Sequence, residues 1–294
     1  MDIKTTALSI LELGQRTNQE DSLYPDKGRE AFSSDLYILC DGMGGHEKGE
    51  VASSTVCAVM SEYIAANAPE GKEFTESDFR AALAAAYDRL DALDDDSPKK
   101  MGTTLTFLKF HGGGCLAAHI GDSRIYQVRP SSKEILFKTR DHSLVNDLIT
   151  IGEITEEEAR THRQRNVITR AIQPGQERRA VADIAHLSDI APGDYFFMCS
   201  DGILEQMTDN NLVNILSMDK PDEKKRDIIV KVTEDNKDNH SAHIIRVLSV
   251  GDGEEEAVPE ARSEAVDEPK PRKRRLFWIV TAAVILAVLL AIVL

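Results

Sequence analysis

The chain has 294 residues, a formal net charge of −15 and a hydrophobic content of 41%. That length suits one sizeable domain, or two small ones, with appendages, and the acidic balance argues against a nucleic-acid partner. The first residues, MDIKTTALSI, lack a signal-peptide pattern. Dispersed cysteines without a CxxC pair are typical of core residues in a reducing compartment; they are Cys40, Cys57, Cys115 and Cys199.

Hydrophobic periodicity predicts a mixture of strands and helices. Apolar residues at three- and four-residue steps indicate amphipathic helices, and alternating or short apolar runs indicate strands. A glycine-rich turn, HGGG, suggests a hairpin in the middle of the chain. In chain order we expect strands over 5–15, 36–40, 101–110, 115–129, 134–140, 195–200 and 241–250. Helices are expected over 51–68, 75–93, 141–172, 210–217 and 222–234.

One apolar run ends in a turn with the features of a cation site. Residues 36–40, LYILC, are predicted to form a buried strand that ends at Asp41, before GMGG. The glycines permit a tight turn and leave backbone carbonyl groups accessible. A carboxylate in that position suits a hard cation, although a plain β-turn fits the same residues. The layout recurs where residues 195–200 are followed by Asp201 and Gly202, and two such strand ends are more informative than one.

The C-terminal residues predict a membrane anchor. Residues 251–275 are first acidic and then basic, without apolar periodicity, and we expect a disordered linker there. Residues 276–294 are uncharged, and as a helix they would extend roughly 28 Å, close to the thickness of the bilayer core. A buried core helix is the alternative, but a helix that is apolar on all sides favours a membrane span. The preceding PKPRKRR predicts that the rest of the chain lies in the cytoplasm.

Eight segments, taken in order, resemble the metal-dependent protein serine/threonine phosphatases of type 2C, particularly the bacterial form. The segments are RTNQED (16–21), DGMGGHEKG (41–49), GTT (102–104), GDSRIY (121–126), DHSLVNDLITIGEIT (141–155), RNVITRAI (165–172), SDG (200–202) and DNHS (238–241). They fall within residues 1–250, which we assign as the catalytic domain. The resemblance implies an α+β fold, an α-β-β-α sandwich of two antiparallel sheets flanked by helices, with a metal site in a cleft at one end.

The resemblance also implies a binuclear Mn²⁺ or Mg²⁺ centre with oxygen ligands, as such hard ions prefer. Asp41 would bridge both ions, and Gly42 would offer its backbone carbonyl. Asp201 and Asp238 would complete one of the two sites. Asp122, together with Asp201, resembles the third-metal site of bacterial members.

The remaining residues of the motif are expected to act around the metals. Glu20 and Asp21 resemble ligands that act mainly through coordinated waters. Arg16 resembles the phosphate-binding arginine, whose planar guanidinium makes a two-pronged contact that lysine reproduces poorly. Without the resemblance, a surface ion pair would be the ordinary interpretation of Arg16 with Glu20 and Asp21.

The general acid has no assigned residue. In animal relatives a histidine follows the Asp-Gly pair, and here that position is Met43, which cannot donate a proton. His46 is close in sequence but occupies a different position of the motif, and a loop-orienting role suits it better. A metal-bound water is one candidate for the acid.

Two further assignments remain open. The usual glycine pair before Asp-Asn is missing, so Asp235 competes with Asp238 as a ligand; the strand expected after Asp238 favours the latter. Residues 141–172 match the flap beside the cleft in bacterial members. Arg163 and Arg165 are candidates for contact with a phosphopeptide, and solvent-facing arginines are the ordinary alternative.

We therefore expect a cytoplasm-facing, membrane-anchored enzyme that hydrolyses phosphoserine and phosphothreonine in proteins by direct attack of a metal-activated water. Cys199 lies in a predicted strand, which argues against a cysteine nucleophile. Expected substrates are phosphorylated proteins, including those of a membrane-associated serine/threonine kinase, and the catalytic domain is expected to be monomeric. The alternatives are a different metal-dependent hydrolase and a membrane-tethered pseudophosphatase that acts as a binding module. Metal-dependent turnover of a small phosphoester separates the enzyme from the binding module.

Overall fold

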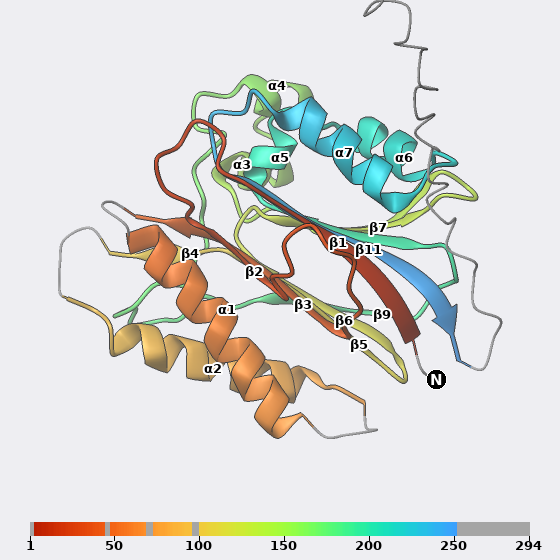
Figure 1. Cartoon of the computed structure of the whole chain (residues 1–294). Helices are drawn as coiled ribbons and strands as arrows, with labels where there is room; N and C mark the ends of the chain where they lie inside the picture. Colours follow the sequence, from red (N-terminus) through yellow and green to blue (C-terminus); the bar gives the residue numbers. More distant parts are fainter. Residues whose placement is uncertain (1–2, 45–47, 69–72, 96–99, 252–294) are drawn as a thin grey trace, which may run out of the picture. The chain divides into compact units, whose positions relative to one another are not determined.

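The structure, a computed structural model, describes residues 3–44, 48–68, 73–95 and 100–251. The chain divides into two compact units, Met1–Pro259 and Glu260–Leu294, and the described residues all belong to the first. That unit contains two antiparallel sheets (Figure 1). The first sheet has the order β1 (Ile3–Glu12), β11 (His240–Val250), β10 (Tyr195–Cys199), β7 (Arg124–Arg129), β8 (Glu134–Lys138). The second has the order β2 (Asp21–Tyr24), β3 (Leu36–Met43), β5 (Leu105–His111), β6 (Gly114–Ile120), β9 (Asp183–Leu187), and β4 (Gly102–Thr103) pairs with β3.

Helices cover the outer face of each sheet, as Figure 1 shows. On the second sheet lie α1 (Lys48–Asn67) and α2 (Glu76–Asp91). On the first lie α5 (Asp201–Leu204), α6 (Asp209–Leu216) and α7 (Asp222–Thr233), and the shorter α3 (Leu144–Thr150) and α4 (Glu156–Thr161) follow β8. Antiparallel sheets flanked by helices are the arrangement that the resemblance implied, and that prediction is confirmed.

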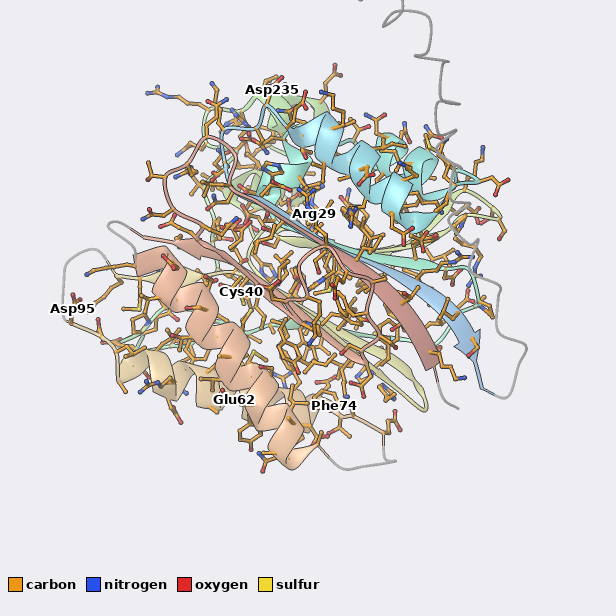
Figure 2. All side chains as sticks on the ribbon, viewed as in Figure 1. Arg29, Cys40, Glu62, Phe74, Asp95 and Asp235 are labelled. Carbon is orange, nitrogen blue, oxygen red and sulfur yellow. The ribbon has the colours of Figure 1, made fainter. Side chains whose placement is uncertain are left out.

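The hydrophobic core has three parts, one beneath each helical layer and one between the sheets. Strand β10 illustrates how it is built. Tyr195 and Phe197 face the helices of the first sheet, while Phe196 and Met198 pack between the sheets. Because both faces of β10 are covered, all five residues are buried, which explains an apolar run without alternation. Cys40 in β3 is buried beneath α1 (Figure 2).

The sequence-based prediction differs from the structure chiefly in the flap and in the strands. Residues 141–172 are not one helical region, because α3 and α4 are short and the chain then returns in extended form, with Ser143 bridged to Ile168. Strands β2 and β9 were not expected, since each is short and lacks a clear alternation. The expected strand over 115–129 is two strands, β6 and β7, in different sheets.

Gly121 separates those two strands. Its φ of +106° lies in the region that L-residues rarely adopt. A Cβ atom there would lie 2.6 Å from Thr104 Cγ2. The chain therefore passes from the second sheet to the first at this glycine, and Asp122 follows it directly.

No helix in the described ranges has the length and apolar character needed to cross a membrane. The predicted linker (251–275) lies outside those ranges apart from Gly251, and the predicted span (276–294) lies outside them entirely.

Candidate active site

Two of the predicted ligands face each other across neighbouring strands. In the antiparallel register of β2 and β3, Asp21 is paired with Asp41. Asp21 is buried, and the Ser200 hydroxyl donates a hydrogen bond to its Oδ2 at 2.9 Å. Side chains directly opposite each other in such a pair lie about 5 Å apart at Cβ, so the register brings together two carboxylates that are twenty residues apart in the sequence.

The other carboxylates come from the corresponding ends of strands in the first sheet. The last residue of β10 pairs with Ala242 in β11 and with Arg124 in β7. Because the strands are antiparallel, the end of β10 lies beside the beginnings of β11 and β7. Asp201 follows β10, Asp238 precedes β11 and Asp122 precedes β7. We call these three residues, together with Asp21 and Asp41, the acidic cluster.

The acidic cluster carries negative charge without sufficient compensation from the protein. Burial raises the pKa of Asp21 to about 7, and Asp201 and Asp238 contribute by repulsion. Burial, together with repulsion from Asp21 and Asp201, raises the pKa of Asp41 well above its ordinary value. Burial and repulsion from neighbouring carboxylates raise the pKa of Asp201 to about 6 and that of Asp122 to about 8. Such shifts mark a site that needs a cation.

Asp122 supports this conclusion by its contacts. Its side chain is 7% exposed. Its buried Oδ1 has no hydrogen-bond partner among the described residues. An orphaned carboxylate oxygen beside other carboxylates suits divalent cations such as Mg²⁺ and Mn²⁺, which take oxygen ligands. The residues present therefore fit the metal ions that the resemblance implied.

The GTT segment fixes the backbone of Asp41. The Asp41 amide donates to Thr104 Oγ1 at 3.0 Å, and the Thr104 amide donates to the Asp41 carbonyl at 2.8 Å. The Thr103 hydroxyl also donates to that carbonyl, at 2.9 Å. Thr104 Oγ1 is hydrogen-bonded in turn to Ser123 Oγ at 2.8 Å, so the segment also connects Asp41 to the loop that holds Asp122.

Gly42 occupies a position where no side chain fits. Its amide donates to the Glu20 carbonyl at 3.0 Å. A Cβ atom at Gly42 would lie 2.3 Å from the Gly49 carbonyl oxygen and 2.5 Å from that of Glu20. A Cβ atom at Gly49 would lie 2.8 Å from Glu20 Oε1, which places the Glu20 carboxylate against the first turn of α1. The two glycines therefore allow β3, α1 and Glu20 to approach closely.

Arg16 lies beside the acidic cluster. Its Nη2 is 2.6 Å from Asp238 Oδ2, and this hydrogen bond raises the pKa of the Arg16 guanidinium. About half of the Arg16 side chain is exposed, so it remains accessible to a ligand. Asp235 is exposed on the loop after α7 (Figure 2), where its carbonyl accepts a hydrogen bond from Gln15. The structure thus brings Asp238, rather than Asp235, to the cluster.

Two further candidates, Arg163 and Arg165, are not brought into the acidic cluster. Arg163 and Arg165 follow α4 and are exposed, and His46 lies outside the described residues. The flap segment is closed at its base by backbone hydrogen bonds from Leu144 to Val167 at 2.9 Å and from Thr169 to His142 at 2.8 Å.

The sequence-based prediction missed a second group of side chains at that base. The rings of His119 and His142 stack with centroids 4.4 Å apart, and their nitrogens and an Asp183 oxygen lie within 4.8 Å of one another. The Gly121 amide donates to His142 Nδ1 at 3.1 Å. The other ring nitrogen of His142, Nε2, lies 3.2 Å from Asp183 Oδ2 and 3.1 Å from Arg170 Nη1. These contacts tie the flap to the GDS loop.

A second contact between the flap and the GDS region involves Asp141, the first residue of the DHS segment. Arg124 donates to both carboxylate oxygens of Asp141, at 2.6 and 2.7 Å. A two-pronged contact of this kind orients both partners. In the sequence, His119 lies two residues before GDS and Asp141 begins DHS. Neither position by itself indicates which residue the side chain contacts.

Comparison with known proteins identifies the family of this chain. The family described as "Protein phosphatase 2C" matches residues 14–220. A putative 2C-type protein phosphatase of Streptococcus pyogenes is 35% identical over 74% of this chain and 87% of its own length. The crystal structure of the serine/threonine phosphatase PstP/Ppp of Mycobacterium tuberculosis is 30% identical and covers 83% of this chain and 98% of that one, with a TM-score of 0.70. A PstP catalytic domain in complex with two manganese ions is 29% identical over 84% of this chain and all of that chain, with a TM-score of 0.69.

The fold and the acidic cluster define a metal-dependent phosphohydrolase. The chain belongs to the protein phosphatase 2C family, and it is a protein serine/threonine phosphatase.

Proposed function

We propose that the acidic cluster of this chain binds Mn²⁺ or Mg²⁺ and hydrolyses phosphoserine and phosphothreonine in proteins. The observation that carries the proposal is the uncompensated negative charge of the cluster, where burial and mutual repulsion raise the pKa of four aspartates. The manganese ions of the similar PstP catalytic domain support the choice of metal.

Each ligand has a role that its position supports. Asp41 is central in the cluster and would hold both ions, while the Gly42 carbonyl, Asp201 and Asp238 would complete the pair of sites. Glu20 and Asp21 would hold waters of the coordination shell. Asp122, with its orphaned oxygen, would hold a third ion together with Asp201. When bound, the metals supply an activated water nucleophile and neutralise phosphoryl oxygens.

The protein's own contribution is orientation. Arg16 is held by Asp238 at 2.6 Å with about half of its side chain exposed, so its remaining donors are available to a phosphate. A planar guanidinium fixes the phosphate in one orientation through paired hydrogen bonds. Thr103 and Thr104 fix the backbone of Asp41, so this carboxylate needs little rearrangement when substrate binds.

The first experiment is hydrolysis of p-nitrophenyl phosphate by the full chain in detergent, with Mn²⁺, with Mg²⁺ and with EDTA. Turnover that requires a divalent ion and disappears in Asp41→Asn supports the proposal. The matched control is Asp235→Asn, which changes an exposed aspartate of the same region and should leave turnover unchanged. A folded wild-type chain without turnover in either metal would favour a binding module instead.

We further propose that residues 276–294 anchor the enzyme in the cell membrane and that residues 251–275 link this anchor to a cytoplasmic catalytic domain. The support is the uncharged, apolar sequence of the segment and the basic residues before it. Tethering raises the local concentration of substrates on the same membrane, for which the products of a membrane-associated serine/threonine kinase are the natural class.

A comparison of the full chain with residues 1–250 tests the anchor. Both should hydrolyse a soluble phosphopeptide at the same rate, and only the full chain should sediment with vesicles. The full chain, reconstituted in vesicles, should also dephosphorylate a vesicle-bound phosphopeptide faster. Equal partitioning of the two proteins into the vesicle fraction would rule the anchor out.

A further inference from the structure

An arginine-rich segment interrupts this acidic chain. Residues 161–182 contain five arginines and one glutamate, with no lysine or aspartate, and therefore carry a net charge of +4 in a chain of −15. The segment leaves α4, returns along the flap and leads into β9. Charge of this sign, concentrated in one stretch, indicates an anionic ligand.

Part of the segment lines a pocket of about 620 Å³. Its lining includes Met43 from β3, Thr169 and Arg170 from the flap, and Gln173 and Arg178 from the stretch that follows. The volume falls within the range of small-ligand pockets in proteins and is sufficient for one or two amino-acid side chains.

The pocket adjoins the acidic cluster through Met43. Asp41 and Met43 are two residues apart on β3, and both are half-buried, whereas Gly42 between them is buried. Alternate residues of a strand point to the same face, so Met43 lies about 7 Å from Asp41 on the face that Asp41 uses. Gln173 and Met43 both pack against Gly102. A Cβ atom at Gly102 would lie 2.8 Å from Gln173 Cγ and 3.2 Å from Met43 Cγ, so the glycine leaves room for both side chains.

Most of the arginines in the pocket are already paired. Arg170 contacts Asp183 at 2.8 Å. Arg179 contacts Asp88 at 2.6 Å and Asp91 at 2.7 Å.

Arg178 differs from these two arginines. It is exposed, and among the described residues its side chain has no ion-pair or hydrogen-bond partner. It is therefore the guanidinium in the pocket that remains available to a ligand.

We propose that this pocket is a substrate subsite in which Arg178 binds an acidic or phosphorylated side chain two residues from the phosphorylated serine or threonine. The proposal rests on the function proposed above. An extended peptide advances about 3.3–3.6 Å per residue, and side chains two apart point the same way, so a spacing of two residues matches the separation of Asp41 and Met43. The paired arginines, 170 and 179, hold the walls of the pocket in place.

The experiment compares kcat/KM of the full chain in detergent for phosphothreonine peptides that differ at one position. The peptides carry alanine or aspartate two residues before or two residues after the phosphothreonine. Because Arg178 is solvent-exposed, we expect about a fivefold preference for aspartate at one of these positions, which falls at high salt. Hydrolysis of p-nitrophenyl phosphate, which is too small to reach the pocket, serves as the measure of catalysis itself.

Variants of Arg178 then test whether this residue causes the preference for aspartate. Arg178→Ala should remove it, and Arg178→Glu should reverse it in favour of alanine, with p-nitrophenyl phosphate hydrolysis unchanged. The matched control is Arg29→Ala, at an exposed arginine 78% accessible that is absent from the pocket lining, and it should keep the preference. No preference in an active wild-type chain, or a preference that survives Arg178→Glu, would overturn the subsite. Absence of p-nitrophenyl phosphate hydrolysis in the wild type would instead overturn the proposed function, and the subsite with it.

Discussion

Replacing Asp122 by asparagine should stabilise the metal-free protein. Burial and repulsion from Asp201 and Asp141 raise the pKa of Asp122 to about 8, whereas an unfolded chain titrates this residue near 4. Between about pH 4 and pH 8, the folded state therefore retains a proton that the unfolded state has lost. Stability of the metal-free protein falls as pH rises through that window, and asparagine removes the group responsible.

The size of the effect follows from the shift. One pKa unit corresponds to about 1.4 kcal/mol, so a rise from about 4 to about 8 sets a ceiling of roughly 5 kcal/mol at pH 8. Neighbouring carboxylates relieve part of this electrostatic cost by taking up protons themselves. We therefore expect Asp122→Asn to raise the free energy of unfolding by about 2 kcal/mol at pH 8. For a catalytic domain of this size, that gain raises Tm by about 4–8 °C.

The assay is thermal unfolding in EDTA at pH 5 and pH 8, followed by circular dichroism. Asp122→Asn should unfold at a higher temperature than the wild type at pH 8, and the difference should shrink at pH 5. Asp219→Asn, at an exposed aspartate, is the matched control and should change neither value. If Asp122→Asn unfolds at the same or a lower temperature than wild type at pH 8, the carboxylate is already compensated and the electrostatic argument for the cluster fails. Excess Mn²⁺ should narrow or reverse the difference, because the metal gains a ligand in the wild type.

Three further substitutions test the geometry of the site. Asp41→Asn should lower kcat for p-nitrophenyl phosphate by at least about a thousandfold, because it removes the charge that would hold two cations together; a folded variant with full activity would exclude this role. Gly42→Ala should destabilise the protein by more than about 3 kcal/mol in urea unfolding, because the new methyl group overlaps two backbone carbonyls, and a change within about 0.5 kcal/mol would contradict the packing. Arg16→Lys should raise KM about tenfold with a smaller change in kcat, because lysine cannot make the two-pronged contact; an unchanged KM would show that Arg16 does not bind the phosphate.

The local patterns predicted most elements but could not predict how they assemble. Helices α1 and α2 carry clear periodicity, and α2 begins with a capping box in which Thr75 and Asp78 exchange hydrogen bonds. The sandwich was expected from the motif resemblance alone, because pairing between β1 and β11, which lie more than two hundred residues apart, leaves no local signal. The flap was predicted as one helical region, whereas only α3 and α4 within it are helical, since its charged residues fit a solvated helix as well as a solvated loop.

At the candidate site, too, the sequence motif identified residues, whereas the contacts between residues distant in sequence came only from the fold. The motif named each member of the acidic cluster, but the residues that hold Asp41 in place, Thr103 and Thr104, have hydrogen bonds that only the fold reveals. The choice between Asp235 and Asp238 likewise depended on the ion pair with Arg16. Arg178 had no motif at all, and its interest follows from its position beside the strand that carries Asp41.

The distribution of charge explains why such an acidic chain can attract phosphorylated substrates. A net charge of −15 repels a phosphoprotein, but at physiological ionic strength that repulsion is screened within about 8 Å. Close to a bound phosphate, the positive charges would be those of the metals that the acidic cluster would hold, of Arg16 and, at the proposed subsite, of Arg178. Selection among phosphoproteins can then depend on which side chains flank the phosphorylated residue, since the flanking positions are the ones that enter this local positive field.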